Sequence, residues 1–190
     1  MIRKATREDA VQIAPLILVI LEDMELPILK QISEKELRKL LIEGICHNEY
    51  RYSYQHIHVC ERDGKIAGFA AGYPGSQEAK IDAPLQQILQ KNGYEFKALR
   101  FFEECETSSG EWYLDSIVTK EEYRGCGVGT ELLEALDQIA TDCGEKVIGL
   151  NCDEGNPHAQ RLYERIGFKV VGERMISQHR YVHMQKNIIN

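Results

Sequence analysis

The spacing of apolar and polar residues predicts strands and amphipathic helices that follow one another along the chain. Apolar residues fill much of 10–21 behind a capping pattern at 6–9, so a short strand over 2–5 is expected to lead into a helix. A second helix is predicted over 33–45. Two β-rich runs, 56–61 and 65–73, flank the pair Asp63-Gly64, and an Asp-Gly pair between strands is a strong hairpin signal.

The pattern weakens between 75 and 110, where two weakly helical pieces near 84–91 and 96–104 stand among polar residues. We interpret this segment as an insertion between strands that forms a surface cover. The second half of the chain has a sharper pattern of elements. Strands are predicted over 111–118, 146–152, 168–173 and 179–186, with a helix over 129–143 ended by Gly144 and another between Asn156-Pro157 and Gly167.

The order of these elements predicts an α+β fold. We find no internal repeat, low-complexity tract or linker, and 190 residues with 43% apolar content are enough for one sizeable core. We therefore expect a single domain over 1–190 with a central mixed, mostly antiparallel sheet flanked by helices.

Composition excludes several classes of partner. The chain has 23 Lys and Arg against 30 Asp and Glu, a net charge of −7, which argues against a protein that coats nucleic acid or binds membranes through a basic patch. Its most apolar stretch, 16–21, is far shorter than the ~20 residues of a membrane span. The six cysteines form neither a Cys-x-x-Cys pair nor a zinc-finger spacing, so we expect free thiols, a cytoplasmic location and no metal site.

A glycine-rich turn over 124–129 separates the strand at 111–118 from the next helix. Glycines let a backbone approach a phosphate, and a helix start supplies unpaired N–H groups, so a ligand with a pyrophosphate is expected here. A Rossmann fingerprint would need glycine or alanine where the chain has Thr130, and a Walker loop would need a lysine that is absent. The pattern that remains is Arg-x-x-Gly-x-Gly.

With its flanking segments, this pattern resembles the GNAT superfamily of acyl-CoA-dependent N-acetyltransferases. The resemblance is carried by the strand ending in Ile117-Val118, the loop KEEYRGCGVG, the helix TELLEAL, the strand VIGLNCDEGN and the helix-turn NPHAQRLYERIGF. It covers 111–172 closely, whereas 1–75 match only the family's order of elements. It implies transfer of an acetyl group from acetyl-CoA to a primary amine, of a small molecule or a peptide, by direct attack in a ternary complex without a metal.

The resemblance also implies which residues bind the cofactor. The pyrophosphate would lie on backbone amides between Gly125 and Thr130, with Arg124 in a scaffold or phosphate role. Ile117 and Val118 would bond pantetheine as a pseudo-strand, and Asn156 would contact the CoA arm. The amides of the turn belong to Gly125, Cys126, Gly127, Val128, Gly129 and Thr130.

Three residues are candidates for catalysis. Tyr163 stands where the family commonly keeps a tyrosine that protonates the CoA sulfur, and its ordinary pKa of ~10 exceeds the ~8.5 of a thiol. Glu111 matches the place of an acid that takes the amine proton in many relatives, and Asp115 would orient the amine. Strand alternation puts both acids on one face, although either can equally be a solvated surface residue. By the same alternation Glu111, Tyr113, Asp115 and Ile117 share one face, and Trp112, Leu114, Ser116 and Val118 share the other.

The acceptor is less defined by the sequence than the cofactor. We expect the early helices and the segment 75–110 to determine which acceptor binds. The acidic chain suits a cationic amine. Tyr181 and His183 share a face of the last strand and would reach the acceptor pocket, although a plain edge-strand histidine is the simpler interpretation. The alternative to an enzyme is a catalytically idle acyl-CoA-binding module that regulates a partner. A strand edge near the C-terminus would permit a homodimer.

Overall fold

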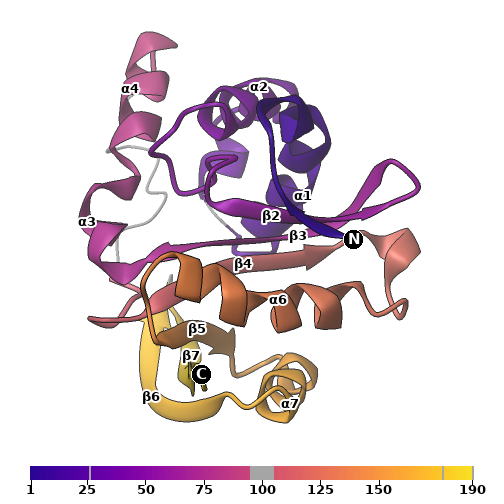
Figure 1. Cartoon of the computed structure of the whole chain (residues 1–190). Helices are drawn as coiled ribbons and strands as arrows, with labels where there is room; N and C mark the ends of the chain where they lie inside the picture. Colours follow the sequence, from indigo (N-terminus) through magenta and orange to yellow (C-terminus); the bar gives the residue numbers. More distant parts are fainter. Residues whose placement is uncertain (26, 95–104, 177, 190) are drawn as a thin grey trace.

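A seven-stranded sheet in the order β1-β2-β3-β4-β5-β7-β6 is the centre of the computed structural model, which describes residues 1–25, 27–94, 105–176 and 178–189 (Figure 1). Among the described residues five of the six strand pairs are antiparallel and β4–β5 is parallel. The predicted mixed, mostly antiparallel α+β fold is therefore confirmed. The strands are β1 (Ile2–Lys4), β2 (Ile57–Arg62), β3 (Lys65–Pro74), β4 (Trp112–Thr119), β5 (Val147–Asp153), β6 (Lys169–Ile176) and β7 (His179–Asn187).

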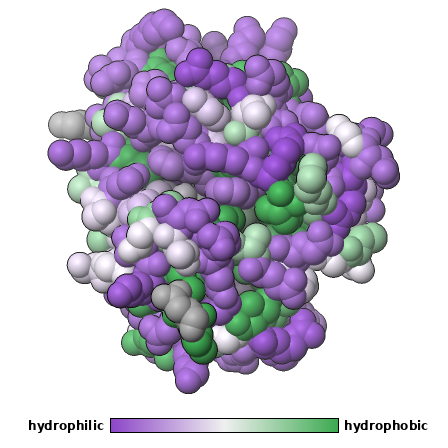
Figure 2. All heavy atoms as spheres, viewed as in Figure 1, coloured by the Kyte–Doolittle hydropathy of each residue, from purple (hydrophilic) through white to green (hydrophobic). Residues whose placement is uncertain are grey.

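Helices cover both faces of the sheet. The α-helices are α1 (Ala10–Asp23), α2 (Glu34–Ile45), α3 (Glu78–Ile81), α4 (Ala83–Lys91), α6 (Val128–Asp142) and α7 (Pro157–Arg165), and the 3-10 turns are η1 (Arg7–Asp9), η2 (Pro27–Lys30), η3 (Gly75–Gln77) and η4 (Glu121–Tyr123). One core lies where α1, α2 and α4 pack against the sheet, and a second lies under α6 and α7 (Figure 1). Apolar residues in the view of Figure 2 form small patches on a mainly hydrophilic surface. None of the described helices is long and apolar enough to cross a membrane.

The local signals in the sequence correspond to observed element boundaries. The carboxylate of Asp9 accepts the Thr6 N–H at 2.8 Å, and this capping pattern starts η1, which leads into α1. Asp63 and Gly64 both have positive φ, 50° and 73°, as a tight hairpin turn requires. The first weakly helical piece of the insertion is α4, whereas the piece near 96–104 lies outside the described residues.

A β-bulge in β4 corrects the prediction of strict alternation. Ala71 pairs with Ser116 and Gly72 with Leu114, so Asp115 is an extra residue opposite β3. A bulge of this kind turns the side chains that follow it to the other face. The grouping of Ile117 with the face of Asp115 is therefore wrong: Ile117 packs into the core under α6, and Val118 packs against the core of α1 and α2.

The parallel pair β4–β5 is short. It joins 112–114 to 148–150, yet β4 continues to Thr119 and β5 to Asp153. The strands therefore diverge towards their carboxyl ends, and backbone groups of β4 on that side are left for another partner. The space between the two strands is the position at which an extended ligand can replace a strand.

A buried arginine joins three segments beside this space. Arg51, between α2 and β2, is 2% exposed. Its guanidinium donates hydrogen bonds to Asp82 at 3.0 and 3.2 Å, pairs with Asp115 on β4, and donates to Glu106 at 3.5 Å. Asp82 and Glu106 belong to the insertion between β3 and β4, which thus contributes charge to the interior as well as covering the surface.

Burial makes this carboxylate cluster dependent on its cation. Loss of water raises the pKa of Asp82 despite the opposing effect of Arg51, and burial raises the pKa of Glu106 to about 7. A buried ion cluster that loses one partner leaves charges without compensation. The stability of the fold around Arg51 is therefore expected to depend on pH.

We predict that Arg51→Met lowers the free energy of unfolding by about 3–5 kcal/mol at pH 8, because three buried carboxylates lose their cation. The loss should shrink towards pH 4.5. Without the guanidinium the pKa values of the folded carboxylates rise above their unfolded values, so protonation at low pH favours the folded state and discharges the cluster. Urea unfolding at several pH values measures both effects.

Arg38→Met is the matched control, because Arg38 pairs with Glu34 on the exposed surface of α2. It should cost less than about 0.5 kcal/mol, with little dependence on pH. A loss at Arg51→Met that is equal at pH 4.5 and pH 8 would contradict the electrostatic account of the cluster.

Candidate active site

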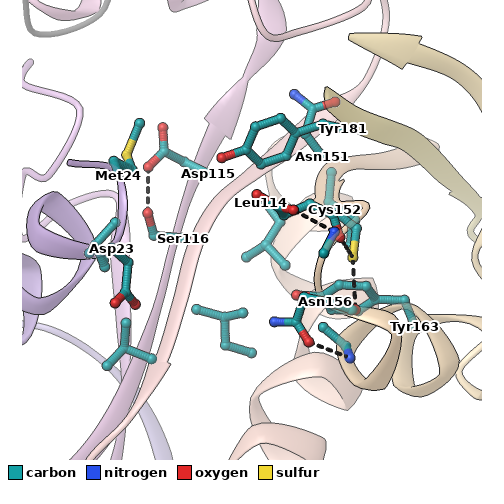
Figure 3. A pocket seen from close by; sticks show the side chains of 17 residues that line it. Asp23, Met24, Leu114, Asp115, Ser116, Asn151, Cys152, Asn156, Tyr163 and Tyr181 are labelled. Atoms are coloured by element: carbon teal, nitrogen blue, oxygen red, sulfur yellow. Dashed lines mark hydrogen bonds between the residues drawn. The ribbon is translucent and has the colours of Figure 1, made fainter. Parts of the chain in front are cut away.

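A cavity of about 580 Å³ lies where β4 and β5 diverge. In Figure 3 Asp115 and Ser116 of β4 face Asn151 and Tyr181 across it, with Asn156 and Tyr163 farther along the wall. The lining residues come from α1, β4, β5, α7, β7 and the turn before α7. They are Ile20, Asp23, Met24, Leu114–Val118, Leu150–Asp153, Gly155, Asn156, Ala159, Tyr163 and Tyr181.

A smaller cavity of about 140 Å³ adjoins the first and extends it inward. The two share Asp115, Ser116, Asn151 and Tyr181 among their lining residues, and the inner one adds Glu106. The described lining of the outer cavity contains three aspartates and no lysine or arginine, while the inner lining adds Arg51 beside its carboxylates. A cavity with excess negative charge favours a cationic ligand.

The glycine-rich turn presents its backbone to solvent as the sequence predicts. Gly125 and Gly127 have φ of 76° and 82°, and Gly127 is the N-cap of α6. Glu131 donates the first bond of the helix, to the Gly127 carbonyl at 3.0 Å, so the amides of 128–130 have no acceptor within α6. The side chains of Arg124 and Cys126 are exposed. An anion on this turn would therefore be held by backbone amides and the positive end of α6.

Tyr163 lies in the wall of the outer cavity, on α7 (Figure 3). Its ring packs edge-on against Phe168, with 6.0 Å between ring centroids. Burial, and to a smaller extent the neighbouring Cys152, raises the pKa of Tyr163 above its ordinary value. The phenol is therefore protonated across the neutral range and is able to donate a proton.

The other predicted cofactor residues lie along the same wall. Ile117 and Val118 line the cavity from the part of β4 that has left β5. Asn156 also lines it, and its side-chain oxygen accepts the Ala159 N–H at 3.1 Å as the N-cap of α7. The structure thus brings Tyr163, Asn156, Ile117 and Val118 together.

Glu111, by contrast, lies away from the cavity, fully buried just before β4. Its carboxylate accepts the Ser108 N–H at 2.6 Å and the Gln185 amide at 2.7 Å, and faces His183 Nε2 at 3.1 Å. Burial by itself raises the pKa of Glu111, but these hydrogen bonds bring it below the ordinary value. A carboxylate held in this way outside the cavity lining is not placed to take a proton from an amine in the cavity.

Asp115 lines both cavities, and its side chain is 3% exposed. One oxygen pairs with Arg51 and accepts the Tyr73 hydroxyl at 3.4 Å, and the other accepts Ser116 at 2.8 Å. Its oxygens are therefore engaged by the protein, and Asp115 supplies a fixed charge in the floor of the site.

Tyr181 and His183 separate in the structure. Tyr181 lines the cavities, whereas His183 is buried behind them. The edge-strand interpretation of His183 is wrong, because β7 lies between β5 and β6. His183 Nδ1 is 2.7 Å from Asn151 Oδ1, and Asn151 donates to the Glu106 carbonyl at 2.9 Å.

The sequence analysis did not identify Arg51, Glu106 or Asn151 as site residues. Arg51 stands in the run Tyr50-Arg51-Tyr52, where a charged residue between aromatics was the one available sign. Glu106 follows a weakly patterned segment and carries no motif. Among the described residues no group of three His, Cys, Asp or Glu side chains is arranged to hold a metal ion.

Comparisons with known proteins agree with this geometry. The sequence profile of the acetyltransferase (GNAT) family matches residues 22–168. A crystal structure described as an acetyltransferase is 48% identical, with a TM-score of 0.92 and complete coverage of both chains. An N-acetyltransferase from Staphylococcus aureus Mu50 is 30% identical, with a TM-score of 0.85, over 97% of this chain and 99% of that one.

A curated relative gives a shorter match. Spermine/spermidine N(1)-acetyltransferase of Bacillus subtilis strain 168 is 39% identical over 69 residues, which are 36% of this chain and 45% of the relative. The match thus spans less than half of the length of that relative. The profile match and the full-length structural likeness lead to one conclusion: this chain belongs to the acetyltransferase (GNAT) family.

Proposed function

We propose that this protein transfers the acetyl group of acetyl-CoA to a primary amine that binds as a cation. The observation that carries the proposal is the cavity between β4 and β5, which has Tyr163 and Asn156 in one wall and a carboxylate floor at Asp115. This arrangement suits a reaction in which a thioester and an amine occupy one site together. It supports our proposal that the amine attacks acetyl-CoA directly in a ternary complex.

In this proposal the chain holds CoA largely through its backbone. Backbone amides between Gly125 and Thr130 bind the pyrophosphate, apart from that of Cys126, which donates to the Tyr123 carbonyl at 3.2 Å. The positive end of α6 stabilises the charge of the pyrophosphate. Pantetheine takes the place of a strand beside Ile117 and Val118, where β4 has lost its β5 partner. The thioester then lies in the cavity within reach of Tyr163.

The chemistry needs an unprotonated amine and a leaving group that is easily displaced. The amine nitrogen bonds to the acetyl carbonyl carbon, the carbon–sulfur bond breaks, and the thiolate receives a proton from the Tyr163 hydroxyl. The raised pKa of Tyr163 keeps the phenol protonated at neutral pH but also makes it a weaker acid, so the proton moves only as negative charge develops on the sulfur. The carboxylates that line the two cavities outnumber Arg51, and together they attract the acceptor as an ammonium ion.

Polyamines are the first acceptors that we propose. The aspartates of the outer cavity suit a ligand with more than one positive charge, and one relative bears the name of a spermine and spermidine acetyltransferase. Mass spectrometry of products from a panel of primary amines, spermidine included, tests the assignment. An acetylated product supports an enzyme, while binding of acetyl-CoA with no product from any amine would favour an idle acyl-CoA-binding module.

Tyr163→Phe is expected to lower kcat on the order of 10²-fold, because the thiolate loses its proton donor. The KM for acetyl-CoA should change by less than about twofold, since the ring and its packing on Phe168 remain. Steady-state kinetics with the best acceptor measures both. Tyr54→Phe, outside the cavity lining, is the control, and unchanged kcat in Tyr163→Phe would remove Tyr163 from the mechanism.

A charge placed at the start of α6 tests the pyrophosphate site. Gly129 tolerates a Cβ, because the nearest atom, Thr119 Oγ1, would be 3.7 Å away. Gly129→Asp should weaken acetyl-CoA binding by about tenfold or more relative to Gly129→Asn. The two side chains have nearly the same size, but only that of Asp carries a negative charge, which repels the pyrophosphate. Calorimetric titration measures both affinities.

The difference between these two variants should diminish as the salt concentration rises, since salt screens exposed charges. The folded state should tolerate either residue, because an acidic group at a helix N-terminus is favourable. Equal affinity of the two variants for acetyl-CoA would place the pyrophosphate elsewhere.

A further inference from the structure

The inner cavity contains a second carboxylate besides Asp115. Glu106 is 6% exposed and lines this cavity together with Asp115, Ser116 and Tyr181. Its backbone is fixed from two directions, because Glu78 accepts the Glu106 N–H at 2.7 Å and Asn151 donates to the Glu106 carbonyl. The backbone of Glu106 is therefore held in position by contacts that do not involve its carboxylate.

The three carboxylates around Arg51 are not compensated equally. Asp82 receives hydrogen bonds from two guanidinium nitrogens, and Asp115 pairs with the third. Glu106 receives its guanidinium contact at 3.5 Å, and its other oxygen accepts the Tyr113 hydroxyl at 2.9 Å. Of the two acids that line the inner cavity, Glu106 thus shares less of the Arg51 charge and is the one able to take up a proton.

We propose that Glu106 is the general base that takes the proton from the acceptor ammonium ion in the inner cavity. This inference rests on the proposed acetyl transfer and adds the residue that activates the amine. Asp115 and Arg51 have a different role, because they form an ion pair with each other. This ion pair forms the rigid floor of the cavity on which the amine lies.

The proton balance of the reaction follows from this assignment. The ammonium nitrogen loses a proton to the Glu106 carboxylate, and the neutral amine bonds to the acetyl carbon while the carbon–sulfur bond breaks. The sulfur takes the proton of Tyr163. The new amide nitrogen gives its second proton to water, and water later reprotonates Tyr163. Glu106 afterwards releases its proton to water through the cavity, so the acid and the base return to their starting states.

The surroundings of Glu106 favour proton exchange near neutral pH. Burial raises the pKa of Glu106 to about 7, and nearby acids act in the same direction against Arg51. A base with this pKa is half ionised at the pH at which it works. Within the described ranges, the titratable and charged groups that interact with it are Arg51, Tyr73, Glu78, Tyr113, Asp115 and Tyr181.

The test is the pH profile of kcat/KM for spermidine, or for the best acceptor of the panel, in Glu106→Gln. In the wild type the rate should rise with pH through about 7, because the ionised carboxylate is the active form. In the variant this rise of kcat/KM with pH (the acidic limb of the profile) should be lost, with a rate about 10²-fold lower at pH 7. The gap should close towards pH 10, where the amine loses its proton to solvent.

Asp82→Asn is the matched control, because Asp82 also pairs with Arg51 but does not line either cavity. It should keep the limb near pH 7. An equal loss in Asp82→Asn, a Glu106→Gln profile that matches the wild type, or a loss that is constant at all pH values would overturn the assignment. Glu106→Asp should retain the limb at a reduced rate, which covers the case in which Glu106→Gln folds poorly.

Failure of the proposed function has a different signature. If the wild type acetylates no amine while it binds acetyl-CoA, the transferase proposal fails, and the role of Glu106 falls with it. If the wild type is active and Glu106→Gln equals it at every pH, the transferase stands and the base lies elsewhere.

Discussion

Two parallel strands that pair for three residues and then separate determine where everything else in the site lies. Pairing of β4 with β5 ends at Leu114 and Leu150. Beyond that point the backbone of β4 has a free side, α7 covers the opening with Tyr163, and the end of α1 contributes Asp23 and Met24 to the rim. Buried backbone groups need partners, so an unpaired stretch beside a cavity favours a ligand that can supply them.

Charge inside the protein imposes the second constraint. Arg51 permits Asp82, Glu106 and Asp115 to be buried near one another, and two of these carboxylates come from the segment between β3 and β4. The insertion is thereby tied electrostatically to the sheet. A farther hydrogen-bonded set begins at Asn151, which lines both cavities, and runs through His183 to Glu111 behind them. The buried polar residues thus form two groups: one group supports the fold, and the other faces the ligand.

The sequence predicted what depends on local physics. The hairpin at Asp63-Gly64, the caps of α6 and α7 and the glycine turn at 124–129 are encoded by neighbouring residues, and the structure has them in place. It did not predict Arg51 and Glu106, which are 55 positions apart and meet only through the tertiary fold. The burial of Glu111 was likewise unpredictable, because alternation along a strand cannot tell which face receives a neighbouring loop. One side-chain assignment on β4 failed for a different reason, the extra residue at Asp115.

That extra residue has a consequence for how β4 can change. Upstream of Asp115, the strand gives Trp112 and Leu114 to the layer under α6, and downstream it gives Ile117 to the same layer. Removal of the codon for Asp115 would therefore close the bulge and restore strict alternation, with Ile117 and Val118 still facing the layers that they contact now. The phase of the strand would survive, but the buried ion pair between Asp115 and Arg51 would be lost. The extra residue thus places a charge in the interior without changing how the rest of the strand packs.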